Sequence, residues 1–169
     1  MRPAELRAAL PRAWPAFLAR FPTPTPVQLE AAAPILAGRD TLLCAPTASG
    51  KTEAYLAPVA ERVRPGGTGE ARVLLVSPTR ALVNDLYRRI EGPLSAMNLD
   101  CGRWTGDQHD RGRLHAVTLL TPEAANHRAR AEKSRSAGKR VRRLNIPLAP
   151  LSLFLLSEAV GPGLPLWMP

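Results

Sequence analysis

The chain has 169 residues, a formal net charge of +9 and 45% hydrophobic residues, which allows one domain with a buried core and argues against wholesale disorder. No run approaches the ~18 apolar residues of a membrane span, and residues 1–20 lack the apolar stretch of a signal peptide. Cys44 and Cys101 lack metal-ligand spacing. We therefore expect a cytoplasmic protein with two reduced, buried cysteines and no membrane partner.

The net charge is distributed unevenly along the chain and changes at about residue 123. Residues 1–123 hold 15 basic and 12 acidic residues, a net charge of +3, whereas residues 124–169 hold 8 and 2, a net charge of +6. We expect an N-terminal helical segment at 1–20, a folded domain at 21–123, and a basic, then Pro- and Leu-rich tail at 124–169 that is disordered or not native to the domain. The positive charge suits a polyanionic partner.

Helical periodicity dominates the first part of the chain. Residues 4–20 form an amphipathic pattern that Pro11 and Pro15 interrupt, which predicts two short helical pieces. Every second residue of 21–26 is Pro, and a residue that precedes Pro avoids the helical region, so this segment is predicted to be an extended connector. Val27 to Ala37 predicts a helix that ends at Gly38.

Strands and helices then alternate. Apolar runs predict buried strands at 40–45, 72–77, 99–105 and 116–120, and helices at 53–63 and 81–97 separate the first three. This order predicts an α/β fold with a mostly parallel sheet flanked by helices. Ligands bind at the carboxyl ends of the strands in such sheets, so the polar segments 45–52, 77–80 and 121–123 are expected to share one edge.

The segment Ala45 to Thr52 has the spacing A-x-x-x-x-G-K-T, a phosphate-binding P-loop with Ala in place of the usual first Gly. Gly50 lets the backbone curl so that N–H groups face phosphate oxygens, Lys51 supplies a charge to the outer phosphates, and the Thr52 hydroxyl is a Mg²⁺ ligand. The alternative is a Gly-Lys-Thr sequence in an ordinary loop. The predicted ATP-binding loop residues are Pro46, Thr47, Ala48, Ser49, Gly50, Lys51 and Thr52, of which Lys51 and Thr52 are the catalytic candidates.

Five short segments, including the P-loop, resemble the motifs of one protein family. Residues 21–123 resemble the first RecA-like domain of a superfamily 2 helicase of the DEAD/DEAH type, most closely the large helicase-related (Lhr) branch. The matches follow the family's order: residues 24–28 resemble the Q motif, 45–52 motif I, 77–82 motif Ia, 105–107 the turn that follows it, and 121–123 motif Ib.

The resemblance implies an ATP- and Mg²⁺-dependent enzyme that binds a nucleic acid, DNA or RNA. Thr25 and Gln28 would contact adenine, for which the Gln amide has both a donor and an acceptor; a surface Gln is the alternative. Trp14, Phe17 and Phe21 either stack on the base or pack in the core. The residues expected to hold backbone phosphates are Pro78, Thr79, Arg80, Gly106, Thr121 and Pro122, with a surface salt bridge as the alternative for Arg80.

One family motif is missing. Motif II, an Asp-Glu pair that holds Mg²⁺ and orients water, should follow motif Ib, yet after Glu123 the acids are Glu132 and Glu158. A second RecA-like domain is also missing from this chain. We expect a truncated helicase product whose residues from about 124 are read out of frame, or else a divergent tail. The rival functions are a nucleotide-dependent binding module without hydrolysis and an unrelated P-loop kinase or small ATPase.

Overall fold

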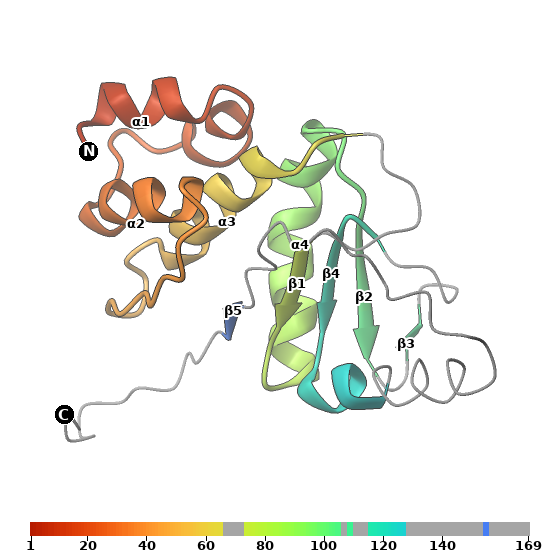
Figure 1. Ribbon diagram of the computed structural model, residues 1–169. Helices are drawn as coiled ribbons and strands as arrows, with labels where there is room; N and C mark the ends of the chain where they lie inside the picture. Colours follow the sequence, from red (N-terminus) through yellow and green to blue (C-terminus); the bar gives the residue numbers. More distant parts are fainter. Residues whose placement is uncertain (66–72, 106–107, 110–114, 128–153, 156–169) are drawn as a thin grey trace, which may run out of the picture.

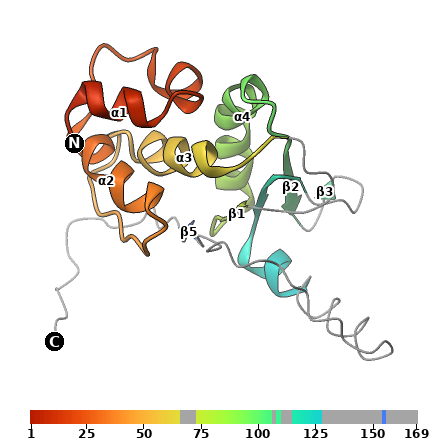
Figure 2. The same ribbon diagram turned by 45° about the horizontal axis from the view of Figure 1, so that its top comes forward.

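The computed structural model describes residues 1–65, 73–105, 108–109, 115–127 and 154–155. Most of the tail at 124–169 lies outside the described residues. Figure 1 shows helices α1 to α3 gathered on one side of the molecule and the sheet on the other, and Figure 2 shows the same division from another direction. The elements are α1 (Pro3–Ala9), the π-helix η1 (Trp14–Leu18), α2 (Pro26–Leu36), α3 (Lys51–Arg62), β1 (Val73–Val76), α4 (Arg80–Ala96), β2 (Cys101–Thr105), β3 (Gln108–His109), β4 (Val117–Leu120) and β5 (Phe154–Leu155).

The strands form one sheet in the order β3-β2-β4-β1-β5. β4 pairs in parallel with β1 on one side and β2 on the other, and β5 pairs in parallel with β1. Only the two-residue β3 is antiparallel, against β2. The apolar run of β4 is buried along its whole length, as expected for a central strand of a parallel sheet. The predicted α/β fold with a mostly parallel sheet is therefore confirmed.

Helices α2, α3 and α4 begin and end within two residues of the predicted bounds, whereas Pro15, expected to interrupt the first helical pattern, lies inside η1. The break after Ala9 divides the first helical pattern into α1 and η1, and α2 ends just before Gly38, which has a φ of +73°. α4 starts after Thr79, whose hydroxyl accepts a hydrogen bond from the N–H of Leu82 at 3.3 Å. The strands predicted at 72–77, 99–105 and 116–120 appear as β1, β2 and β4.

The predicted strand at 40–45 is wrong. Residues 39–46 have no regular secondary structure, and the Leu42 side chain is 90% exposed. Cys44, expected to be buried, is exposed, and Cys101 is half-buried; the two cysteines form no disulfide with each other. An apolar run forms a strand only when a neighbouring strand offers hydrogen-bond partners. β1 is flanked by β4 and β5, so segment 40–45 does not join the sheet beside it.

One apolar core joins the helices to the sheet. It includes Leu6 and Leu10 from the first twenty residues, Leu56 from α3, Ile90 from α4 and Leu119 from β4, all at most 1% exposed. α4 packs on the sheet and also touches η1, so it links the two sides of the molecule. Residues 1–20 thus share the core of the α/β domain.

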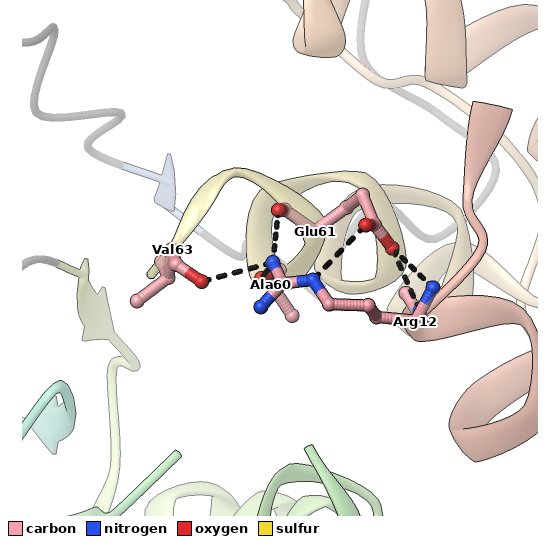
Figure 3. Close-up of polar contacts among 5 residues, drawn as sticks. Arg12, Ala60, Glu61 and Val63 are labelled. Carbon is pink, nitrogen blue, oxygen red and sulfur yellow. Dashed lines mark hydrogen bonds and ion pairs between the residues drawn. The ribbon is translucent and has the colours of Figure 1, made fainter. Parts of the chain in front are cut away.

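A polar network fixes the N-terminal segment to the end of α3 (Figure 3). The Glu61 carboxylate accepts from the N–H groups of Arg12 and Ala13 at 3.0 and 2.7 Å and from Arg12 Nε at 3.2 Å. Arg12 Nη2 donates to the carbonyl oxygens of Ala60, Glu61 and Val63. The last carbonyls of a helix lack partners within it, and a cation there is favourable. Arg12 therefore acts as a cap for α3 from a distant part of the chain.

Candidate nucleotide site and strand-end surface

The P-loop curls around its own lysine. Ala48 and Gly50 have φ values of +58° and +83°, and α3 begins at the next residue, Lys51. Lys51 Nζ donates to the carbonyl oxygens of Ala45 at 2.7 Å and Pro46 at 2.5 Å. The ammonium group is thus held within the loop by two neutral carbonyl oxygens. A phosphate oxygen is a stronger acceptor for it, because it carries a negative charge.

Gln28 connects α2 to this loop. Its Oε1 accepts from the Thr25 N–H at 3.0 Å and its Nε2 donates to the Gly50 carbonyl at 3.3 Å. A Cβ at Gly50 would lie 2.5 Å from Gln28 Nε2, so the contact needs a residue without a side chain. Gln28 is 3% exposed, which excludes the alternative of a surface Gln. The structure brings Thr25, Gln28 and Gly50 together, as expected of one nucleotide site.

Two hydroxyl groups near the loop fit a missing polar ligand. Thr25 Oγ1 and Ser49 Oγ are buried and have no hydrogen-bond partner among the described residues. Buried polar atoms without partners are rare in folded proteins and call for an explanation such as an ion. Ser49 Oγ, the Lys51 amine and the Thr52 hydroxyl form a donor and ligand set that suits a phosphate and Mg²⁺, whereas Thr25 belongs to the capping box at the start of α2 beside Gln28.

Two arginines from other elements reach the start of α3. Arg20 Nη2 lies 2.8 Å from Glu53 Oε1, and the Glu53 side chain is 7% exposed. Arg89 Nη2, from α4, donates to Thr52 Oγ1 at 3.4 Å. The sequence analysis missed both contacts, because neither arginine lies near the P-loop in the chain and no motif includes them.

The three aromatic candidates separate by burial. Phe17 is 3% exposed and belongs to the core, and Trp14 packs against that core. Phe21 is 39% exposed, with the Arg20 guanidinium 4.9 Å from its ring centroid. Of the three, Phe21 alone keeps an open ring for stacking on a base.

The strand-end surface lies where β1 and β4 end side by side, with Val76 opposite Leu120. Pro78, Thr79 and Arg80 follow β1 and are exposed. Thr121 follows β4 and is 5% exposed, and its Oγ1 accepts from the Ala124 N–H at 3.4 Å. Pro122 opens the helical residues 122–127, whereas Gly106 lies outside the described residues.

Of the three polar segments expected at one edge of the sheet, 77–80 and 121–123 lie there together, and 45–52 does not. The P-loop follows no strand, and it meets this half of the molecule through the contact between Thr52 and Arg89. The prediction failed for the P-loop because it depended on strand 40–45.

The His115 side chain is half-buried, because its ring packs against Gly102, and its Nδ1 lies 3.2 Å from Asp100 Oδ2. Within the described ranges, no group of three or more His, Cys, Asp or Glu residues could hold a metal ion. None of the described helices is long and apolar enough to cross a membrane.

Known structures have the same fold. The chain superposes with a TM-score of 0.61 on a hypothetical ATP-dependent RNA helicase from Sulfolobus tokodaii, with 23% identity over 72% of this chain and 37% of that one. The TM-score is 0.58 for the DEAD-box helicase Mss116 bound to ssRNA and UDP-BeF, with 21% identity over 70% of this chain and 26% of that one. The fold is thus that of a RecA-like domain.

The family follows from the sequence match. Residues 25–144 match the DEAD/DEAH box helicase family, and the chain belongs to it. It is 42% identical over 68 residues to DEAD-box ATP-dependent RNA helicase 57 of Oryza sativa, covering 40% of this chain and 13% of that protein. It is 40% identical over 72 residues to the probable ATP-dependent RNA helicase DDX52 of Bos taurus, covering 43% and 12%. The chain thus matches about an eighth of the length of these relatives.

Proposed function

We propose that this chain is the ATP-binding part of a DEAD-box ATP-dependent RNA helicase of the cytoplasm. The link between Gln28 and the Gly50 carbonyl carries the proposal, because it places the predicted adenine-binding amide against the phosphate loop. The names of the relatives favour RNA over DNA. We also propose the Lhr branch, which the resemblance of residues 21–123 supports and a phylogeny would test.

Each residue of the site has a proposed role. Lys51 Nζ would exchange the Ala45 and Pro46 carbonyls for the outer phosphates of ATP. Thr52 Oγ1 would hold Mg²⁺, which supplies charge neutralisation when bound. Gln28 and Thr25 would contact adenine, with Phe21 stacking on its face. The remaining loop residues, Pro46, Thr47, Ala48, Ser49 and Gly50, would surround the phosphates with backbone N–H groups.

The strand-end surface is the proposed RNA site. The exposure of Pro78, Thr79 and Arg80 supports contact with backbone phosphates. Pro122 and Gly106 remain proposed contacts from the neighbouring turns. Because the Thr121 hydroxyl is buried and bonded to the Ala124 N–H, we assign it to holding the turn that carries these residues.

We further propose that the chain binds ATP without turning it over. After Glu123 the sequence contains no Asp-Glu pair to hold the metal and orient water. Removing such groups, or the arginine finger that a second RecA-like domain would supply, lowers phosphoryl-transfer rates by several orders of magnitude, about 10³–10⁵ for the arginine finger alone. The rival function, a binding module that responds to nucleotide, predicts the same lack of turnover.

We propose that the end of the chain is out of frame with the helicase sequence, with the change of frame later than the position near residue 124 that the sequence suggested. The family match extends to residue 144, so a change of frame would lie within or after the Arg- and Lys-rich part of the tail. Sequencing the locus tests this proposal. An Asp-Glu pair restored in another frame just downstream supports it, and the absence of such a pair in all frames rejects it.

The function is tested by measuring ATP and GTP affinities of the wild type, Lys51→Ala and Gln28→Ala. Lys51→Ala should weaken ATP binding about 10- to 100-fold, because it removes a hydrogen bond to a charged group. Gln28→Ala should bring ATP and GTP affinities together while retaining phosphate binding. Equal ATP and GTP affinity in the wild type contradicts the adenine site. Turnover near ~1 s⁻¹ with saturating single-stranded RNA, lost in Lys51→Ala, contradicts the proposed inactivity.

A further inference from the structure

Arg89 brings α4 into the nucleotide site. Its Nη2 donates to Thr52 Oγ1 at 3.4 Å across 37 positions of sequence, and Thr52 is 8% exposed. Its Nη1 lies 3.8 Å from Asp85 Oδ2, one helical turn earlier on α4. The Asp85 side chain is 65% exposed and that of Arg89 is 47% exposed, so water weakens this ion pair. Arg89 is therefore tethered on its own helix and reaches the P-loop helix with its other amino group.

The contact matters because of what Thr52 does at the proposed site. Its hydroxyl oxygen is the proposed Mg²⁺ ligand, and Arg89 already donates a hydrogen bond to that oxygen. A guanidinium group is charged at every physiological pH and has several donors in one plane, which suits phosphate oxygens. Arg89 thus carries a permanent positive charge beside the place where the metal and the phosphates would lie.

Two cations cannot share this oxygen without repulsion. The Arg89 guanidinium and Mg²⁺ would each neutralise phosphate charge when present alone. Because they repel each other, the affinity for ATP gained with both is smaller than the sum of the two separate gains. With no metal present, Arg89 adds a second cation beside Lys51 that can support the anion. With Mg²⁺ on Thr52 Oγ1, the contribution of Arg89 falls.

We propose that Arg89 is a positioning residue that sets how strongly ATP binding depends on Mg²⁺. This inference rests on the proposed function of the P-loop as an ATP site. Arg89 holds the Thr52 hydroxyl in place and supports ATP when the metal is scarce. The same helix begins at Arg80 with Thr79 as its N-cap, so α4 carries both the start of the proposed RNA site and, nine residues further on, the contact with Thr52.

The test compares three variants of the full chain: Arg89→Gln, Arg89→Lys and the control Arg88→Gln. Arg88 is the preceding residue of α4 and is exposed, so its variant makes the same charge change outside the contact. Circular dichroism and melting first confirm that each variant is folded. The dissociation constant of ATP is then measured by calorimetry with excess Mg²⁺ and with EDTA.

Arg89→Gln should weaken metal-free ATP binding about fivefold, the upper range for a partly exposed charge contact, and change Mg²⁺·ATP binding less than about twofold. The ratio of the two constants then rises about fivefold, Arg89→Lys recovers part of the loss, and Arg88→Gln leaves the ratio unchanged. Equal weakening under both conditions, or an equal effect of Arg88→Gln, overturns the role of Arg89. A wild type that binds ATP under neither condition rejects the proposed function itself.

Discussion

The nucleotide side and the strand-end side of this domain are held together by different kinds of contact. On the nucleotide side, polar contacts join residues far apart in sequence, such as Arg12 with Glu61 and Gln28 with Gly50. On the strand-end side, the parallel ladder of β1 and β4 fixes the backbone, and Thr79 caps α4 by accepting from the Leu82 N–H three residues along the chain. The nucleotide side should therefore lose more when one side chain is removed.

The largest expected effect is on the cap of α3. Arg12→Met should lower the free energy of unfolding by about 2–3 kcal/mol, because it leaves the half-buried Glu61 carboxylate and several carbonyls without their cation. Urea unfolding followed by circular dichroism measures it. The control Arg39→Met, at an exposed position, should change stability by less than about 0.5 kcal/mol. Equal losses in the two variants would show that the network does not stabilise the fold.

Gly50→Ala should have the next largest effect. Placing a residue with a side chain at a φ of +83° lowers the free energy of unfolding by about 1–2 kcal/mol. The new Cβ would also lie 2.5 Å from Gln28 Nε2, so the Gln28 amide must move. We expect this loss in chemical denaturation, together with weaker ATP binding. Gly92→Ala is the matched control, since a Cβ there meets nothing within 4 Å, and it should raise stability by about 0.5–1 kcal/mol as Ala replaces Gly within α4. A neutral Gly50→Ala would contradict the close approach of α2 to the P-loop.

Thr79→Ala on the strand-end side should cost about 1 kcal/mol, the usual loss for a helix cap. Thr79→Ser keeps the hydroxyl and should retain most of the stability. If the proposed RNA site is correct, Thr79→Ala also weakens binding of single-stranded RNA, measured by fluorescence anisotropy, whereas Thr79→Ser does not. A loss of stability without a loss of RNA affinity would restrict Thr79 to a structural role.

The smallest effect concerns Glu5 on α1. Hydrogen bonds from the Arg2 N–H and then from the Arg2 side chain lower the pKa of Glu5 below its ordinary value of 4.5. Its contribution to stability is therefore present above pH 4.5 and is lost as the pH falls through the lowered pKa. Glu5→Gln should reduce Tm slightly at neutral pH, and the difference from the wild type should shrink in acid. A difference from the wild type that stays constant as the pH falls contradicts this.

Local patterns predicted the helices and the central strands well. The periodicity of α2 and α4, the Pro and Gly residues that limit them, and the apolar runs of β1 and β4 all act over short distances of sequence. The P-loop spacing likewise placed Lys51 and Thr52 at the start of α3. The pairing of Gln28 with this loop came from the resemblance and is compatible with the observed contact.

The failures share a physical cause, which is dependence on partners far along the chain. Segment 40–45 has the composition of a strand, but it pairs with no neighbour in the sheet. Arg12 binds backbone carbonyls, which every residue has, so nothing in the sequence around Glu61 marks its partner. Arg89 reaches Thr52 only because α4 packs near α3, which periodicity cannot show.

The cap of α3 also bears on the order in which the protein can fold during synthesis. Arg12 leaves the ribosome first, and its acceptor at Val63 follows 51 positions later. At about 5–20 residues per second, Arg12 waits roughly 3–10 s for this partner. During that time the apolar residues of α1 and η1 have no helix α3 to pack against. The apolar residues of this segment are therefore open to non-native contacts until α3 is complete.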